Sequence, residues 1–176
     1  MIELCLHGGN VSWGKISEWP LKLIQIGTDS KYFHVGIRYN HRLIIESTSK
    51  RGVDIRPLSH YEEIVKKEGR IIDIYGCVVP IDEPKFFDWL VDQNDRKYDM
   101  NSILRLAWLK LSVQRKKAND YQKNNDYFCS ELAMTGLRRF ALNQDSFYDL
   151  PACVVTSPAD ITRSKSFKKI GSLNYE

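Results

Sequence analysis

Long apolar runs and closely spaced cysteines are both absent from this chain of 176 residues. No segment reaches the ~18 consecutive apolar residues of a membrane-spanning helix, and residues 1–10 lack the basic start and apolar stretch of a secretory signal. The four cysteines stand far apart, without the paired spacing of a zinc site or the density of a disulfide framework. We therefore expect reduced thiols and, by default, a cytoplasmic location, while a phage-encoded origin or another route of export stays open.

Internal repeats, low-complexity tracts and long linkers rich in proline or glycine are also missing. Hydrophobic residues make up 43% of the chain and charged residues 27%, which is typical of globular rather than disordered proteins. A chain of this length is sufficient for one hydrophobic core. Residues 1–176 are therefore expected to form a single domain.

A strong excess of charge of one sign is missing as well. The formal net charge is +4, and the basic residues are spread along the sequence apart from a short run at 115–117. Nucleic-acid-binding domains concentrate their basic residues on one face, so we expect no specific nucleic-acid partner. Peripheral contact with an anionic cell wall or membrane fits this modest charge, whereas the oligomeric state is not indicated.

Strand-like segments lie mainly in the first half of the chain. Residues 33–38, 43–47 and 71–80 are rich in isoleucine, valine and aromatic side chains. Apolar residues at helical spacing predict helices over 84–94, 101–114 and 126–140, with Pro84 in the first turn of the earliest and Asp126 capping the last. The polar segment 116–125 is expected to be the most mobile. The pattern predicts an α+β fold with an antiparallel sheet packed against helices.

The first two predicted strands place a histidine near a carboxylate. If residues 39–41 form a three-residue turn, Val35 lies opposite Ile45, and the same register places His34 opposite Glu46. Directly opposed side chains are close enough for a carboxylate to orient an imidazole, which would favour the imidazolium formed when the base takes a proton from a thiol. The alternative is that His34 is a structural histidine of the sheet and Glu46 faces solvent.

Cys129 falls in the first turn of the last predicted helix. Unpaired backbone N–H groups and the helix dipole favour an anion there, so this position lowers the pKa of a thiol. The backbone N–H of Cys129 is also placed to donate to an oxyanion. The alternative is that Cys129 is a small buried residue of the core.

Three segments in this order resemble the circularly permuted branch of the NlpC-type papain-like amidohydrolases: 33–37 (Phe-His-Val-Gly-Ile), 45–47 (Ile-Glu-Ser) and 127–132 (Tyr-Phe-Cys-Ser-Glu-Leu). Residues 97–99 (Lys-Tyr-Asp) and 157–160 (Ser-Pro-Ala-Asp) resemble two further elements of that branch. In ordinary papain-like enzymes the cysteine precedes the histidine, whereas here, as in the permuted branch, it follows. The likeness covers roughly residues 10–162, and residues 6–10 depart from the Gly-Asp pair with which the family often opens.

The resemblance implies a permuted papain-like fold and a Cys-His-Glu triad, with Cys129 as nucleophile, His34 as general base and Glu46 as the group that orients it. The implied activity is a thiol-dependent hydrolase that cleaves an amide bond, as in a cell-wall peptide, through an acyl-enzyme. A lipid-directed hydrolase or acyltransferase stays open, because the permuted order is shared with lecithin retinol acyltransferase-like proteins. A catalytically silent binding protein of the same fold is the third alternative. The partners expected are peptide, peptidoglycan or lipid substrates.

Six further histidines and cysteines lie outside this set: His7, His41, His60, Cys5, Cys77 and Cys153. The histidines have no carboxylate or thiol at metal-ligand spacing, so we expect surface or structural roles for them and neither a metal site nor a cofactor. The cysteines lie in apolar or strand-like contexts and are expected to be small buried residues. Trp13 and Trp19 would either line a cleft or pack in the core.

Overall fold

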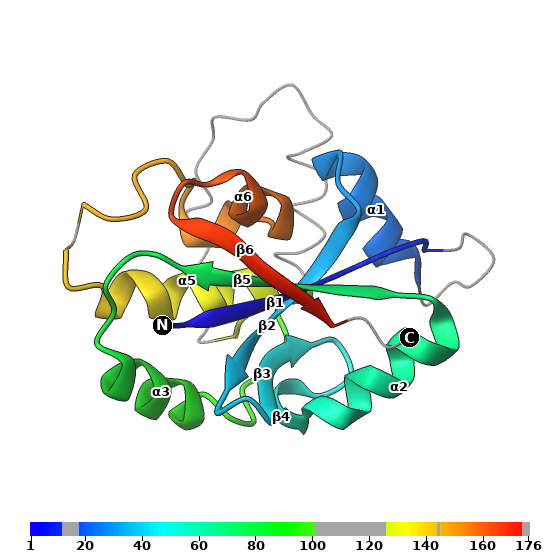
Figure 1. Ribbon diagram of the computed structural model, residues 1–176, viewed down its shortest axis with the longest axis horizontal. Coiled ribbons are helices and arrows are strands. Elements are labelled where there is room, and N and C mark those ends of the chain that lie inside the picture. The colour runs from blue at the N-terminus through cyan, green and yellow to red at the C-terminus, as the bar shows by residue number, and fades with distance from the viewer. Residues whose placement is uncertain (12–17, 101–125, 144, 174–176) are drawn as a thin grey trace.

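The fold is built on one six-stranded antiparallel sheet (Figure 1). The computed structural model describes residues 1–11, 18–100, 126–143 and 145–173. The strands follow the order β4-β3-β2-β1-β5-β6 across the sheet. Their bounds are β1 (Glu3–Gly8), β2 (Tyr32–Tyr39), β3 (Leu43–Thr48), β4 (Gly52–Pro57), β5 (Ile71–Cys77) and β6 (Phe167–Leu173).

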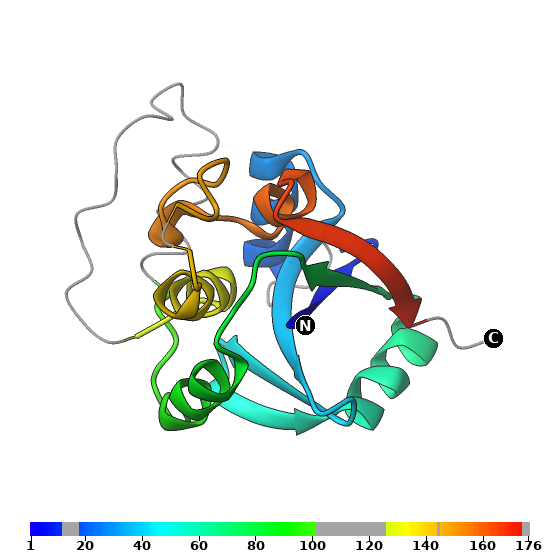
Figure 2. The same cartoon turned by 60° about the vertical axis from the view of Figure 1, so that its left-hand side comes forward.

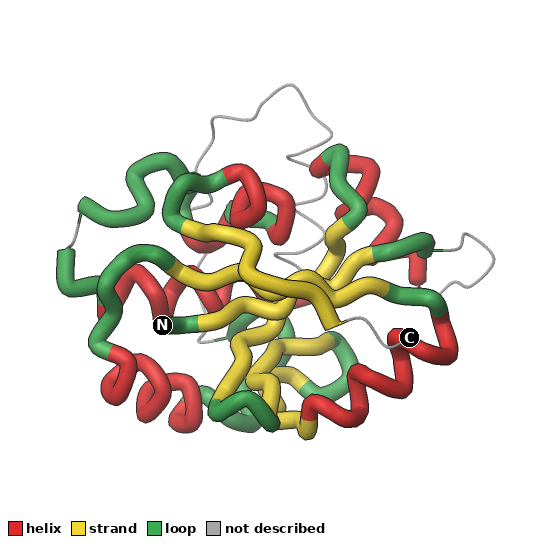
Figure 3. The backbone as a smooth tube through the Cα atoms, in the orientation of Figure 1, coloured by secondary structure: helices red, strands yellow, loops and turns green. Residues whose placement is uncertain are grey.

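Five α-helices in the described residues surround the sheet, as Figure 3 shows. They are α1 (Trp19–Thr28), α2 (Leu58–Glu68), α3 (Glu83–Asp92), α5 (Cys129–Phe140) and α6 (Pro158–Arg163), and a short 3₁₀ turn, η2, covers Cys153–Val155. None of these helices is long and apolar enough to cross a membrane. The α+β class and the antiparallel sheet are therefore as predicted.

Alternation along the strands gives the sheet two apolar faces. One face carries the main core, in which Leu6 and Val35 pack with Trp89 of α3 and Leu132 of α5. The opposite face is covered by α2, whose Tyr61 packs among strand residues. In Figure 2, α3 and α5 lie together on one side of the molecule and α2 lies on the other. Because His34 and Glu46 alternate with the main-core residues of their strands, they belong to the face that α2 covers.

The predicted elements differ from the observed ones mainly at their ends. The strand predicted at 71–80 ends at Cys77, and the helix predicted at 84–94 is α3, with Asp82 accepting a hydrogen bond from the backbone N–H of Lys85. The helix predicted from Asp126 begins instead at Cys129, because Phe128 is extended and fully buried. The segments 101–114 and 116–125 lie outside the described residues.

The predicted register between β2 and β3 is wrong by two residues. Ile37 pairs with Ile45 and Tyr39 with Leu43, so the pairing continues toward Gly36 opposite Glu46. The turn explains the difference, since Asn40 and the residue after it both have positive φ, and the backbone N–H of residue 42 donates to the Tyr39 carbonyl. A shift of two residues keeps every side chain on its expected face.

Candidate active site

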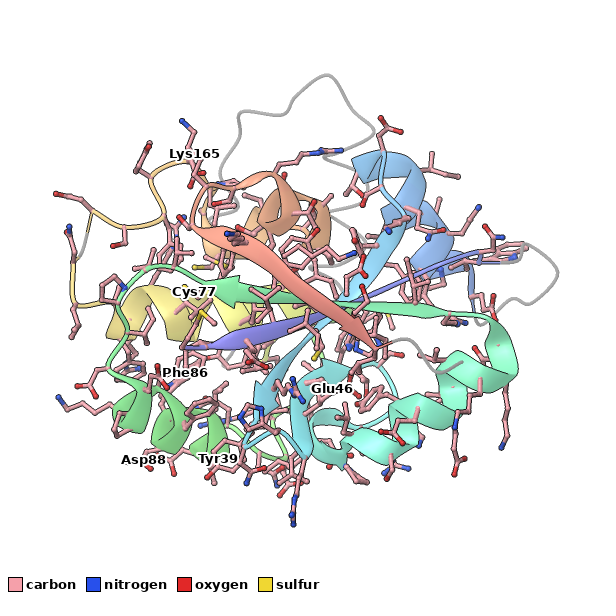
Figure 4. The ribbon with its side chains drawn as sticks, viewed as in Figure 1. Tyr39, Glu46, Cys77, Phe86, Asp88 and Lys165 are labelled. Carbon is pink, nitrogen blue, oxygen red and sulfur yellow. The ribbon has the colours of Figure 1, made fainter. Side chains whose placement is uncertain are left out.

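His34 and Glu46 meet diagonally across β2 and β3. The distance between His34 Nε2 and Glu46 Oε2 is 2.5 Å, and both side chains are largely buried. Diagonal neighbours have widely separated Cβ atoms, but long and aromatic side chains span that distance. Gly36 lies between them, and a Cβ there would stand 2.5 Å from Ile44 Cγ2 and 3.5 Å from Glu46 Cβ. In Figure 4, Glu46 lies near the middle of the molecule, whereas Asp88 and Lys165 lie at its edge.

Cys129 is the first residue of α5 and lies against β2. Its sulfur is buried next to the His34 imidazole, and the backbone N–H groups of Val35 and Ser130 donate toward it. Because His34 Nε2 is directed at Glu46, Nδ1 is the ring nitrogen left for the thiol. The structure therefore brings the three predicted site residues together in the order Cys129, His34, Glu46.

The charges of these three groups reinforce one another. Burial opposes ionisation of Cys129, but the adjacent His34 outweighs it and lowers the pKa of the thiol below its ordinary value. Burial would likewise lower the pKa of His34, yet the Cys129 thiolate and the Glu46 carboxylate raise it to about 10. Burial would raise the pKa of Glu46, and His34 instead lowers it to about 2. The arrangement favours a thiolate, an imidazolium and a carboxylate in a row.

The segment before α5 is held by two parts of the chain that are distant in sequence. The Ser47 hydroxyl donates to the Tyr127 carbonyl at 2.6 Å, and the backbone of Tyr127 exchanges hydrogen bonds with residues 97 and 99. Tyr98 is brought beside Cys129 by this pairing, and burial together with the neighbouring thiolate raises the pKa of its phenol. The 97–99 segment therefore lies next to the nucleophile candidate.

The N-terminus of α5 is also held by the segment that leads into α6. The Ser130 hydroxyl donates to the Thr156 carbonyl at 2.7 Å. Ser157 then caps α6 through its hydrogen bonds with Asp160, and α6 packs against β2. The 157–160 segment, like 97–99, thus supports the elements that carry Cys129 and His34.

Two residues beside the site were not predicted from the sequence. His7 lies directly opposite His34 in the β1–β2 ladder, with ring centroids 5.0 Å apart, and Tyr61 packs edge-on against His7 at 5.1 Å. Burial and the neighbouring His34 lower the pKa of His7 to about 3. Tyr61 directs its hydroxyl at Glu46 without the geometry of a full hydrogen bond, and burial followed by that negative charge raises its pKa. The alternation Leu4, Leu6 against Cys5, His7 was the available signal for β1.

His7, His34 and Glu46 also place three potential metal-ligand atoms within 4.8 Å of one another. The sequence spacing gave no sign of this group, because its members come from three separate strands. The sequence analysis therefore did not anticipate that His7 lies close to two other potential ligands. His41 and His60 are exposed, as expected for surface histidines.

The other three cysteines differ from Cys129 in their electrostatic surroundings. Burial raises the pKa of Cys5 to about 12 and that of Cys77 to about 11, and burial also raises the pKa of Cys153. Cys5 and Cys77 are buried, as predicted, and Cys153 is partly buried. Trp19 is 47% exposed, and Trp13 lies outside the described residues.

When the chain is compared with known proteins, neither a family model nor a curated sequence matches it.

Proposed function

We propose that this chain is a cysteine hydrolase that cleaves an amide bond through an acyl-enzyme on Cys129. The observation that carries the proposal is the contiguous row formed by the Cys129 thiol, the His34 imidazole and the Glu46 carboxylate. A cysteine that only packs in the core would not require a neighbouring imidazole that is oriented by a carboxylate. Nucleophile, base and orienting group in hydrogen-bonding reach are the general signature of covalent catalysis by cysteine.

The first half of the reaction forms the thioester. The Cys129 thiolate attacks the carbonyl carbon, a C–S bond forms, and the carbonyl π electrons move to the oxygen. As the tetrahedral intermediate collapses, the C–N bond breaks and the leaving amine takes the Nδ1 proton of His34. Glu46 keeps the ring oriented through Nε2 during this transfer.

The second half returns the enzyme to its starting state. A water molecule loses a proton to His34 Nδ1 as its oxygen attacks the thioester carbon. Collapse of the second tetrahedral intermediate breaks the C–S bond and releases the acid, leaving the thiolate and imidazolium. The start of α5 supports both halves, because unpaired N–H groups at a helix N-terminus stabilise developing negative charge.

The family proposed for the chain is the permuted NlpC-type branch of papain-like enzymes. Its support is the chain order, with the histidine on β2 and the cysteine at the start of α5. The antiparallel sheet packed against α5 fits a permuted papain-like fold. An amide of a cell-wall peptide is the substrate we favour within that family.

A lipid-directed hydrolase or acyltransferase is the second candidate. Trp19 and Ile26 of α1 are 47% and 50% exposed and are seven residues apart, so they share one face of the helix. This helix packs against β2, the strand that carries His34. An exposed apolar face beside the site suits an acyl chain or a lipid surface.

Thiol reactivity tests the proposed nucleophile directly. Iodoacetamide near pH 7, followed by mass spectrometry of the peptides, should label Cys129 at least about tenfold faster than Cys5, Cys77 or Cys153, because only its pKa is lowered. His34→Ala should slow labelling of Cys129, and the exposed control His60→Ala should not. Equal labelling of all four thiols would contradict the proposal.

Substrate cleavage separates the candidate functions. Wild type should release stem peptides from purified peptidoglycan, Cys129→Ala should lose this activity, and the control Cys153→Ala should keep it. Mass spectrometry that instead finds Cys129 acylated by a phospholipid donor would favour the lipid-directed candidate. Unchanged biological activity in Cys129→Ala would favour a binding protein without turnover.

A further inference from the structure

The group formed by His7, His34 and Glu46 has buried polar atoms in it or beside it that make no hydrogen bond within the described residues. Its three ligand atoms come from β1, β2 and β3 and lie within 4.8 Å of one another. It is the one such group of histidine, cysteine and acidic side chains found in residues 1–11, 18–100, 126–143 and 145–173. Three adjacent strands hold it, so its geometry is fixed by the sheet rather than by a loop.

Two buried polar atoms at this group have no hydrogen-bond partner. They are Nε2 of His7, whose residue is 7% exposed, and the hydroxyl oxygen of Tyr61, whose residue is 3% exposed. Leaving such an atom unpaired is unfavourable, and native proteins usually pair it with protein, water or an ion. Both atoms belong to rings that pack against each other beside Glu46. The unpaired His7 nitrogen is therefore available to a ligand in the interior of the site.

We propose that His7, His34 and Glu46 bind a divalent cation of the zinc class, and that this ion switches off the chemistry of Cys129. Two imidazoles and one carboxylate are a common ligand set for Zn²⁺. With bonds of about 2.0–2.2 Å, tetrahedral ligands stand about 3.3–3.5 Å apart, so side-chain shifts of about an ångström convert the observed group into a site. The Tyr61 hydroxyl or a water molecule is placed to complete the coordination.

Metal binding and the proton shuttle compete for the same atom. The ion takes His34 Nε2, now 2.5 Å from Glu46, and the proton held there is released to solvent. The imidazole keeps its Nδ1 proton, because giving that proton to a leaving amine would leave an imidazolate. His34 therefore stops cycling a proton to and from Nδ1. This inhibition rests on the proposed function, whereas the binding itself does not.

Metal titration of the full chain tests the binding. Protein stripped of metal with EDTA and then dialysed should bind one equivalent of Zn²⁺ in competition with a chromophoric chelator. His7→Phe, which keeps an aromatic ring in place, should bind at least about tenfold more weakly, as should His7→Gln. The control His60→Phe removes an exposed histidine and should bind like wild type. Cys129→Ala should also keep its affinity, because the sulfur is not one of the ligands.

Co²⁺ in place of Zn²⁺ identifies the ligands by their absorption. The wild-type complex should show tetrahedral or five-coordinate d–d bands without a thiolate-to-metal charge-transfer band. Absence of binding to wild type, a strong thiolate band, or loss of binding in Cys129→Ala would each overturn the proposed site. Equal affinity of wild type and a folded His7 variant would do the same, and the wild-type and Cys129→Ala titrations decide the matter if neither His7 variant folds.

The inhibition is measured separately. Saturating Zn²⁺ should lower wild-type cleavage at least about tenfold, with recovery on addition of EDTA, and should change the His7→Phe rate much less relative to its own metal-free rate. Unchanged cleavage by fully metal-loaded wild type would overturn the inhibitory role. A metal-free protein that binds Zn²⁺ but cleaves nothing would instead count against the proposed function alone.

Discussion

Glu46 acts on Cys129 through its hydrogen bond with His34. The carboxylate helps to raise the pKa of His34 to about 10, after the larger opposing effect of burial and together with the Cys129 thiolate. An imidazolium at neutral pH is what lowers the pKa of the thiol. At the scale of single residues, the pKa of the Cys129 thiol therefore depends on a carboxylate that acts through His34.

Replacing Glu46 should move the titration of His34. In Glu46→Gln the charge that stabilises the imidazolium is gone, so the pKa of His34 should fall below its wild-type value near 10 and the pKa of Cys129 should rise. The measurement is NMR titration of the His34 ring in protein kept in EDTA. Glu63→Gln, which removes an exposed carboxylate 3.5 Å from Lys67 on α2, is the control and should leave His34 unchanged. An unaltered His34 titration in Glu46→Gln would show that the carboxylate plays no electrostatic role.

The packing of β2 against β3 decides whether the two site residues of these strands meet. Gly36 leaves room for Ile44 and Glu46, and Ile44 is fully buried, so it has little freedom to move aside. At the scale of elements, the absence of one side chain is what allows a diagonal contact between His34 and Glu46. A methyl group at this point should separate them.

Gly36→Ala should therefore weaken both the site and the fold. The added Cβ would stand 2.5 Å from Ile44 Cγ2, and overpacking of this kind costs about 1–3 kcal/mol of unfolding free energy. Labelling of Cys129 by iodoacetamide should slow in the same variant. Gly171→Ala on β6 is the matched control, because a Cβ there has no atom within 4 Å, and it should behave like wild type in both measurements. Fast labelling in a stable Gly36→Ala protein would contradict this account.

The sequence was sufficient for the elements with a strong apolar pattern and insufficient for the others. β2, β3 and α3 were predicted because isoleucine, valine and aromatic residues mark them. β6 was missed because Phe167–Leu173 contains two lysines and a glycine and pairs only along one edge. α2 was missed although Leu58, Tyr61 and Val65 recur at helical spacing, because charged residues dominate the rest of Leu58–Glu68.

The candidate site was predictable in its members and not in its geometry. The structure brings His34, Glu46 and Cys129 together, since strand alternation survives a two-residue error in register. The diagonal contact depends on positive φ at Asn40 and His41, which the alternation of the strands does not specify. His7 joins the site through the pairing of β1 with β2, which is a property of the whole sheet.

At the scale of the whole molecule, a buried carboxylate on β5 links three strands of the sheet. Asp73 accepts hydrogen bonds from Tyr32 of β2 and from Ser172 of β6, and its ion pair with Lys169 measures 2.8 Å. Burial would raise the pKa of Asp73, but these partners outweigh it and hold the pKa below the ordinary value. This carboxylate thereby links β2, β5 and β6, three strands of which β2 is not adjacent to the other two.

Neutralising Asp73 should destabilise the whole molecule. Asp73→Asn should lower the free energy of unfolding by about 1–3 kcal/mol at pH 7, because charged donors then face a neutral amide. Because the folded pKa lies below the unfolded one, this contribution is present above about pH 4 and is lost as the pH falls further, so the two proteins should converge in acid. Urea unfolding followed by circular dichroism measures both effects.

The control for Asp73 is an aspartate whose own carboxylate is partly exposed. Asp54 is 29% exposed and pairs with Arg51 and Arg56 near the surface, so Asp54→Asn should change stability by no more than about 1 kcal/mol. Equal losses in the two variants would mean that Asp73 contributes no more than an ordinary surface ion pair.

His34 and Val35, which help to lower the pKa of the Cys129 thiol, are made long before Cys129 itself. During synthesis on the ribosome, β2 emerges early and α5 follows some ninety residues later, and the groups that lower the pKa of the thiol are His34 and the backbone of Val35 together with Ser130. Until α5 docks, the nascent sulfur is an ordinary protonated thiol. The thiol therefore gains its lowered pKa only when α5 packs against the sheet.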